Sequence, residues 1–335
     1  MTKLSNGRWV VLLTSGYNNG TLDNNGVTTN NPVGNGQGYL YVLDAYTGAP
    51  IKTISTGAGS PATPSGLAKV AAFATDPFKN NFSTYVYGGD LEGGLWRFDI
   101  NAGTVIKMAT LRDPGGNPQP ITTTPQLGLI NKKRVVFVGT GKYLEQTDLT
   151  STQVQSVYAI KDDDLSSEIT SLRGGGLVQQ TLSPDGDFRT VSSQAVDFGT
   201  GFGWMIDFPA GERVNIDPLL LNGVLLMPTT VPNSTSCLGG GYGWFNYFNY
   251  KTGSAPPLAG GVVSEKLNTP AVGFNIVYGS DGKPVVSVVE SNDPTPHHLK
   301  NKGVAANSDG SRETVLEPFG DGTYGKRSIW RELVR

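Results

Sequence analysis

The sequence has little of what many metal, redox and membrane proteins use. Among 335 residues there is one cysteine, Cys237, and two histidines, His297 and His298. One cysteine excludes an internal disulfide and a cysteine-based metal site, and neighbouring histidines point apart on an extended chain. Only 16% of the residues are charged, with a net charge of -2, which argues against a nucleic-acid partner. No run of about 18 apolar residues occurs, so we expect no transmembrane segment.

Glycine and proline are abundant instead. The 45 Gly and 21 Pro demand many tight turns, and the few charged residues do not supply the solvated faces of long helices. A short helix is expected only over Ser166 to Leu172. The composition therefore predicts a chain of strands and loops.

One phrase returns five times, and it consists of an aromatic-rich strand, then Asp or Asn, and in most copies a Thr-Gly or Ala-Gly turn. Copies roughly 40 to 60 residues apart indicate a radial β array, because one four-stranded unit does not bury its own apolar face. We therefore predict an all-β fold, a β-propeller of quinoprotein-like blades with long loop insertions, with residues 1–335 as a single domain. The copies span Tyr39 to Gly48, Gly94 to Gly103, Ser156 to Asp163, Gly203 to Gly211 and Gly243 to Gly253.

The number of blades follows less directly. The five phrases and a hairpin expected over Phe274 to Ser291 suggest six or seven. Propellers tend to join their first and last strands, and Trp330 with Leu333 are placed to make that closure. We also expect Glu212 and Arg213 to pair between blades.

Catalytic motifs are not found. The string GTGKYLE, at Gly139 to Glu145, has no Ser or Thr after its lysine and no helix pattern behind it, so it is not a phosphate-binding loop. Both histidines lie in one loop, which leaves no credible Ser-His-Asp order. We expect no catalytic residues.

Six longer motifs lie along nearly the whole chain, at Val86 to Ile100, Phe137 to Leu149, Gln155 to Ile160, Gly203 to Pro218, Pro232 to Trp244 and Gly325 to Leu333. In sequence and in order they resemble the C-terminal domain of the PilC/PilY family of type IV pilus biogenesis factors and pilus-tip adhesins. The resemblance implies a propeller at the C-terminal end of a larger secreted protein, behind a more variable N-terminal region. The expected location is the cell surface and the pilus tip, associated with the outer membrane after export through the periplasm.

The function implied by the resemblance is non-enzymatic. Such a domain would support pilus assembly, retraction control, twitching motility and adhesion to host or abiotic surfaces. Its expected partners are minor pilins of the pilus-tip complex and its own N-terminal adhesin region.

The family also implies one metal site, a calcium loop similar to an EF-hand. Counting back from Asp90 places Asp76 at the first ligand position, Asn80 at the fifth, Phe82 at the seventh through its carbonyl, and Thr84 at the ninth. Phe78 at the third position has no ligating oxygen, and Asn81 stands where the turn needs glycine. Calcium takes six to eight oxygens, so this loop is degenerate and its metal-free state is the expected one. We expect no other cofactor.

An enzymatic alternative remains at this point. The phrase at Tyr39 to Gly48 is also similar to the propellers of quinoprotein dehydrogenases, which hold pyrroloquinoline quinone and calcium on the central axis. Under that hypothesis the quinone would bind an axial pocket lined by Trp96, Trp204 or Trp244. A single cysteine excludes the vicinal pair that often lies beside the quinone.

Overall fold

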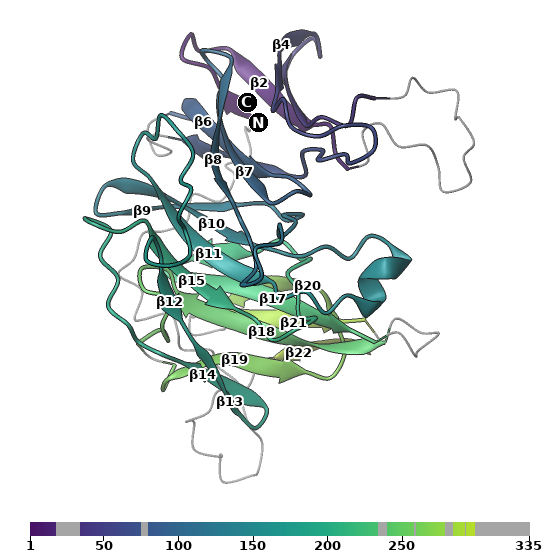
Figure 1. The fold of residues 1–335 in the computed structure, drawn as a ribbon, viewed down its shortest axis with the longest axis vertical. Coiled ribbons are helices and arrows are strands. Elements are labelled where there is room, and N and C mark those ends of the chain that lie inside the picture. The colour runs from purple at the N-terminus through teal and green to yellow at the C-terminus, as the bar shows by residue number, and fades with distance from the viewer. Residues whose placement is uncertain are drawn as a thin grey trace.

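The described residues that have regular structure lie almost all in β-strands (Figure 1). The computed structural model describes residues 1–17, 34–74, 80–233, 240–257, 259–278, 284–291 and 293–298. In this part of the chain the single helix is η1, a 3₁₀ turn over Gln146–Thr150. None of these residues belongs to a helix that is long and apolar enough to cross a membrane. The predicted all-β class is confirmed.

Within the described ranges the strands form five sheets in chain order. The first sheet contains β1 (Thr2–Lys3), β2 (Trp9–Thr14), β3 (Tyr39–Asp44) and β4 (Pro50–Ser55). The second contains β5 (Val70–Ala74), β6 (Ser83–Gly89), β7 (Gly94–Asp99) and β8 (Thr104–Thr110). The third contains β9 (Gln126–Ile130), β10 (Lys133–Gly139), β11 (Ser156–Asp162) and β15 (Gly203–Asp207), with β12 (Val178–Gln180) parallel to β15 at its edge.

The last two sheets complete the order. The fourth contains β16 (Leu219–Leu221), β17 (Val224–Pro232), β18 (Gly241–Asn249) and β19 (Val262–Leu267), extended by β14 (Phe188–Val191) and β13 (Leu182–Asp185). The fifth contains β20 (Ala271–Tyr278), β21 (Pro284–Glu290) and β22 (Asp293–His298). The hairpin expected over Phe274 to Ser291 is β20 and β21.

Four of the five repeated phrases are the third strand of a sheet, namely β3, β7, β11 and β18. The fifth phrase, at Gly203 to Gly211, is β15, the fourth strand of the sheet that already contains β11. Two of the phrases therefore lie in the third sheet. The fifth sheet contains no copy of the phrase and is built on the hairpin of β20 and β21. The total of six or seven blades includes residues outside the described ranges and stays a prediction, as does closure by Trp330 and Leu333.

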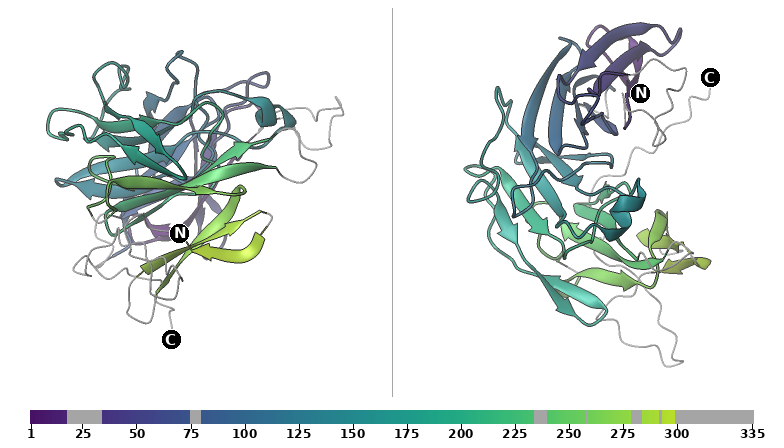
Figure 2. Two further views of the ribbon diagram at one scale, coloured as in Figure 1. Left: turned by 90° about the horizontal axis from the view of Figure 1, so that it is seen from below. Right: turned by 45° about the vertical axis from the view of Figure 1, so that its right-hand side comes forward.

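The sheets pack face to face along an arc, from the first sheet at one end to the fourth and fifth at the other (Figure 2). Strand alternation explains this stacking, because successive side chains point to opposite faces of a sheet. In β11, Tyr158 and Ile160 enter the apolar layer shared with the second sheet, whereas Val157 and Ala159 enter the layer shared with the fourth. Each middle sheet thus contributes to two cores, as propeller blades do.

The segment Ser166 to Leu172 is not helical, and the helix prediction there was wrong. Ile169 forms a parallel bridge with Ala109 at the edge of the second sheet, and its N–H donates to the Met108 carbonyl at 2.8 Å. Ile169 and Leu172 are buried in the layer between the second and third sheets. A tertiary contact therefore holds this segment extended. We call residues 165–177 the strap, since they reach from the third sheet back to the second.

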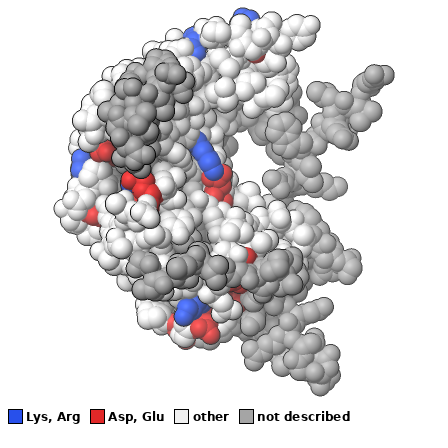
Figure 3. Space-filling model, turned by 90° about the vertical axis from the view of Figure 1, so that its right-hand side faces the viewer, with Lys and Arg blue, Asp and Glu red and all other residues white. Residues whose placement is uncertain are grey.

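Charged side chains are few on the face of the molecule shown in Figure 3, where most of the described surface in view is uncharged. The low charge content of the chain is thus visible on its surface as well. A buried ion pair between Arg97 and Asp162, described below, joins the second and third sheets.

Candidate functional site

The predicted calcium loop falls only partly within the described residues. Asp76 lies outside them. The Asn80 Oδ1 accepts a hydrogen bond from the Phe82 N–H at 3.0 Å, and Thr84 lies in β6, where its carbonyl accepts from the Ile100 N–H at 3.1 Å. Among the described residues no three His, Cys, Asp or Glu side chains gather as a metal site would require. The expectation of a degenerate, metal-free loop stays a prediction.

The repeated phrase has a clear local function at three of its copies. The Asp44 Oδ1 accepts from the backbone N–H groups of Tyr46 and Thr47 at 2.9 and 2.8 Å, and the Gly48 N–H donates to the Asp44 carbonyl at 2.9 Å. The hydrogen bond from the Thr47 N–H contributes most to lowering the pKa of Asp44, and a hydrogen bond from the Arg8 side chain contributes next. Together these bonds hold the pKa of Asp44 well below its usual range. Asp99 and Asn249 cap their own turns in the same way. Asp and Asn at this position are therefore turn residues.

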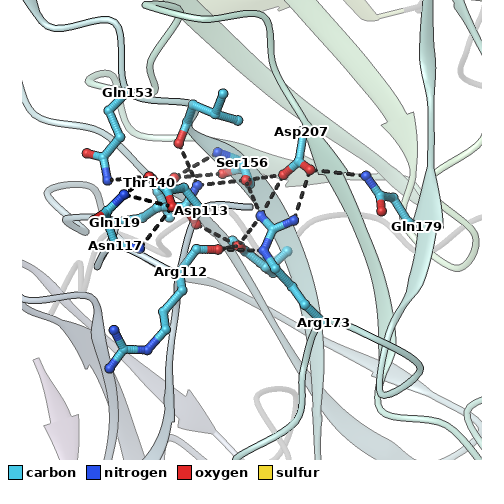
Figure 4. A network of polar contacts seen from close by, with 12 residues as sticks. Arg112, Asp113, Asn117, Gln119, Thr140, Gln153, Ser156, Arg173, Gln179 and Asp207 are labelled. Atoms are coloured by element: carbon cyan, nitrogen blue, oxygen red, sulfur yellow. Dashed lines mark hydrogen bonds and ion pairs between the residues drawn. The ribbon is translucent and has the colours of Figure 1, made fainter. Parts of the chain in front are cut away.

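Asp207 occupies the same position in β15 but does not cap its turn. The residue two positions later is Pro209, which has no N–H to donate. The carboxylate turns instead to Arg173 of the strap, whose Nη2 and Nη1 lie 2.6 Å from Oδ1 and 2.9 Å from Oδ2 (Figure 4). Ser156 and Gln179 donate to it as well, at 2.6 and 3.0 Å. Because Pro209 has no N–H for it to accept, the Asp207 carboxylate binds Arg173, outside its own turn.

Arg173 is the centre of the resulting network. Its Nε donates to the Arg112 carbonyl at 2.6 Å, and its Nη2 donates to the Tyr158 hydroxyl at 3.0 Å. Burial acts to lower the pKa of Arg173, but the hydrogen bonds and charges of Asp207 and Tyr158 together outweigh it and raise the pKa. Burial also raises the pKa of Tyr158 to about 12. The guanidinium is therefore charged and the phenol neutral at physiological pH.

The loop between β8 and β9 forms the other half of the network. The Gln119 Nε2 donates to the Ser156 hydroxyl at 2.8 Å, and its Oε1 accepts from the Tyr158 hydroxyl at 2.6 Å. The Asp113 carboxylate accepts from the Asn117 N–H at 2.9 Å and from the Gln153 side chain at 3.2 Å. Burial raises the pKa of Asp113, but these hydrogen bonds outweigh it and lower the pKa. The loop is thus fixed as an anionic, internally bonded turn.

A cavity of about 500 Å³ lies beside this network, between β8, the loop that follows it and the strap. On one wall the Lys107 Nζ lies 3.0 Å from the Glu168 Oε2, and the Thr110 hydroxyl donates to the Glu168 Oε1 at 2.7 Å. The size is that of a ligand pocket, and the polar groups come from three chain segments. The remaining lining residues are Arg112, Asp113, Pro114, Gly116, Tyr158, Ile169, Thr170, Leu172 and Arg173.

The three tryptophans suggested for an axial quinone pocket lie in different places. Trp96 is in the apolar layer between the first and second sheets, and Trp204 is in the layer between the third and fourth. Trp244 lies under the guanidinium of Arg189, 3.6 Å from its ring centroid. The three tryptophans therefore do not line one pocket together.

The expected pair of Glu212 with Arg213 was also wrong. Glu212 forms a bidentate pair with Arg189, at 2.9 and 2.7 Å. Arg213 donates instead to backbone carbonyls around η1, including those of Asp148 at 2.6 Å and Ser151 at 2.8 Å. The side chains of Glu212 and Arg213 therefore point to different surroundings, although the two residues are adjacent in sequence. Burial lowers the pKa of Arg213.

Sequence reasoning missed the network of Asp207 and Arg173. The repeat itself contained a signal, because Pro209 removes a donor that the other turns use. The partner of Asp207 was not predictable in that way, since Arg173 reaches it only through the path of the strap.

Two curated relatives share sequence with most of the chain. The type IV pilus biogenesis factor PilY1 homolog of Xylella fastidiosa is 26% identical over 318 residues, covering 85% of this chain and 20% of that protein. The type IV pilus biogenesis factor PilY1 of Pseudomonas aeruginosa is 27% identical over 297 residues, covering 73% of this chain and 24% of that protein. The chain thus spans a quarter or less of the length of these relatives.

One solved structure matches the fold of the chain, and one family model identifies its family. The crystal structure of the Pseudomonas aeruginosa PilY1 C-terminal domain superposes with a TM-score of 0.69 at 22% identity, over 88% of this chain and 71% of that one. The family model described as the PilY1 beta-propeller domain matches residues 1–194, more than half of the chain. This chain therefore belongs to the PilY1 beta-propeller domain family.

Proposed function

We propose that this chain is the propeller of a secreted type IV pilus biogenesis factor and that it acts by binding proteins, without catalysing a reaction. The observation that carries the proposal is membership of the PilY1 propeller family, whose curated relatives are named as pilus biogenesis factors. In this proposal residues 1–335 are one propeller domain at the C-terminal end of a larger protein.

The proposed roles are support of pilus assembly, control of retraction, twitching motility and adhesion to host or abiotic surfaces. The proposed partners are minor pilins of the tip complex and the protein's own N-terminal adhesin region. The site of action is the cell surface and the pilus tip, associated with the outer membrane after export through the periplasm. A rigid stack of sheets that presents loops at its ends suits such a binding role, although a fold alone does not determine a function.

Binding to the minor pilins of the same organism tests the proposal. Each pilin would be immobilised and the purified chain passed over it in a surface plasmon resonance experiment, with and without millimolar calcium. Saturable binding supports the proposal, and binding that is independent of calcium supports loss of the metal from the Asp76 loop. The corresponding assay in cells deletes residues 1–335 from the gene of the whole protein and counts surface pili. Normal piliation together with no pilin binding would reject the proposal.

A further inference from the structure

We propose that the cavity beside Arg173 binds a carboxylate group presented by a partner protein, with Arg112 and Lys107 as its hydrogen-bond donors. The inference rests on the proposed function, because it names a contact through which a protein-binding propeller holds its partner. Four observations support it, and they concern free donors, engaged acceptors, net charge and rigidity.

The cavity has donors to spare. The Arg112 side chain is exposed and extends away from the network (Figure 4). Its Nη1 donates to the Gly116 carbonyl at 2.8 Å, while its Nε and Nη2 have no partner among the described residues. Lys107 has an ion pair with Glu168 and further N–H groups that no described residue uses.

The acceptors of the site are already engaged. The Asp207 carboxylate takes hydrogen bonds from Arg173, Ser156 and Gln179. Asp113 is bonded by Asn117 and Gln153 within its own loop and an adjoining segment. Glu168 accepts from Thr110 and Lys107. An incoming acceptor therefore meets no internal competitor for the free N–H groups of Arg112.

The charge of the site favours a monoanion. Its three basic residues, Lys107, Arg112 and Arg173, are matched in number by the three acids Asp113, Glu168 and Asp207. A bound carboxylate would leave one uncompensated negative charge there and a doubly charged phosphate would leave two, so the carboxylate costs less while it still brings two oxygens. The guanidinium of an arginine matches the two oxygens of a carboxylate in a bidentate pair.

The backbone behind Arg112 is held in place before any ligand arrives. The Arg112 carbonyl accepts from the Arg173 Nε at 2.6 Å and lies 3.0 Å from the Tyr158 hydroxyl, whose hydrogen goes to Gln119. Arg173 is oriented in turn by Asp207, which is available because Pro209 removes its usual turn bond. The wall opposite contains a β-bulge, where the pairing of β7 with β8 shifts between Leu95 and Trp96. Bulges redirect side chains, and this one lies beside Lys107. Because the backbone of Arg112 is already ordered, binding of a ligand to its side chain costs little additional backbone entropy.

The carboxylate has two sources in a protein, an Asp or Glu side chain and the end of a chain. Both are tested by titrating this chain with short peptides in a calorimeter. The first peptide is an alanine tetrapeptide with one glutamate and both ends blocked. The second has a free terminal carboxylate and no acidic side chain. The third replaces the glutamate with glutamine and has both ends blocked.

We expect one of the two acidic peptides to bind with a Kd on the order of 1 mM, as suits a single charge-assisted contact, and the glutamine peptide not to bind. Arg112→Gln should weaken binding about tenfold, and Arg112→Lys should restore part of it through charge alone. Lys251→Gln, which removes one positive charge from the exposed turn after β18, is the matched control and should leave the Kd unchanged.

The inference is overturned if neither acidic peptide binds, if the glutamine peptide binds equally well, or if Arg112→Gln and Lys251→Gln behave alike. Surface plasmon resonance with minor pilins separates this failure from failure of the proposed function. Pilin binding that is retained by Arg112→Gln rejects the carboxylate site and leaves the proposed function intact. Pilin binding that falls about tenfold in Arg112→Gln but not in Lys251→Gln supports both.

Discussion

Arg97 in β7 and Asp162 at the end of β11 form an ion pair between two neighbouring sheets, with the Nη1 and Oδ1 atoms 2.5 Å apart. The side chains are 6% and 0% exposed, so the pair is shielded from water. The Tyr87 hydroxyl and the Arg134 guanidinium also reach the Asp162 carboxylate, at 2.6 and 3.3 Å. One acid thus connects the second and third sheets.

Replacing Asp162 by Asn should destabilise the chain by about 3 to 5 kcal/mol, because the buried charge of Arg97 loses its partner. Urea unfolding of the purified variant measures this. The control is Asp163→Asn, which breaks an ion pair with Lys133 that is almost half exposed on both sides. That change should cost much less, because water and salt screen an exposed ion pair. Equal effects of the two substitutions would contradict the structural role of the buried pair.

Asp207 and Asp99 should respond differently to the same substitution. Asp99→Asn keeps an oxygen for the turn, as Asn249 does naturally, so the free energy of unfolding should change by less than about 0.5 kcal/mol. Asp207→Asn removes the charge that pairs with Arg173 and should cost about 1 to 3 kcal/mol. Hydrogen exchange should also become faster in residues 165–177, since Arg173 anchors them. Exchange that stays unchanged in the strap would show that Asp207 does not hold it.

Two turn glycines at positive φ separate backbone strain from crowding. Gly48 has φ +72° and open space where a Cβ would lie, so Gly48→Ala should cost about 1 kcal/mol. Gly253 has φ +69°, but its Cβ would lie 2.6 Å from the ring of Trp204. Gly253→Ala should therefore cost on the order of 3 kcal/mol, the strain plus overpacking. Thermal unfolding of both variants tests this, and similar losses would argue against the crowding at Trp204.

Stability should depend on pH through Asp90. Burial raises the pKa of Asp90 to about 6, against the hydrogen bonds from the Trp96 side chain and the Gly94 N–H. The unfolded chain has the usual value near 3.9, so the folded state holds the proton more tightly. The contribution of Asp90 is therefore fully present below about pH 4 and is lost as the pH rises through about 6.

A shift of about two pH units corresponds to roughly 3 kcal/mol. Unfolding free energies of the unchanged chain and of Asp90→Asn would be compared across this range. The difference between them should move by that amount in favour of the variant as the pH rises. A difference that stays constant with pH would contradict the raised pKa.

Calcium should not stabilise the chain. The loop that begins at Asp76 offers one carboxylate, an amide and a hydroxyl, which is too few oxygens for a strong site. The melting temperature should be the same in millimolar calcium and in chelator, for the unchanged chain and for Asp76→Ala. A rise with calcium that Asp76→Ala abolishes would show that the degenerate loop still binds the metal.

Much of the fold was predictable because its signal is local. The aromatic strand followed by Asp or Asn and a glycine turn depends on bonds within five residues, as at Asp44 to Gly48, and it located the third strand of four sheets. The errors concern contacts between distant segments. Ser166 to Leu172 has a helical pattern, but Ile169 pairs with Ala109 in another sheet. Glu212 finds Arg189 because of how β14 joins the fourth sheet, and no spacing in the sequence shows that.

The candidate site lies between these two cases. Pro209 marks Asp207 as an exception within the repeat, which the sequence alone shows. The cavity depends on the strap returning to β8, and that path is set by packing of Ile169 and Leu172 between two sheets.

The alternation of side chains between successive apolar layers has a mechanical consequence. Each inner sheet packs against an apolar layer on both faces. Within the described residues the first sheet has such a layer on one face only, and Val11 and Leu13 on its other face are partly exposed. Within the described residues the apolar layers therefore couple each sheet chiefly to its neighbours in the chain, as in stacked repeats. A load applied along the described arc would separate its sheets one at a time, starting from the first sheet, so that the arc lengthens in steps under tension instead of failing at once.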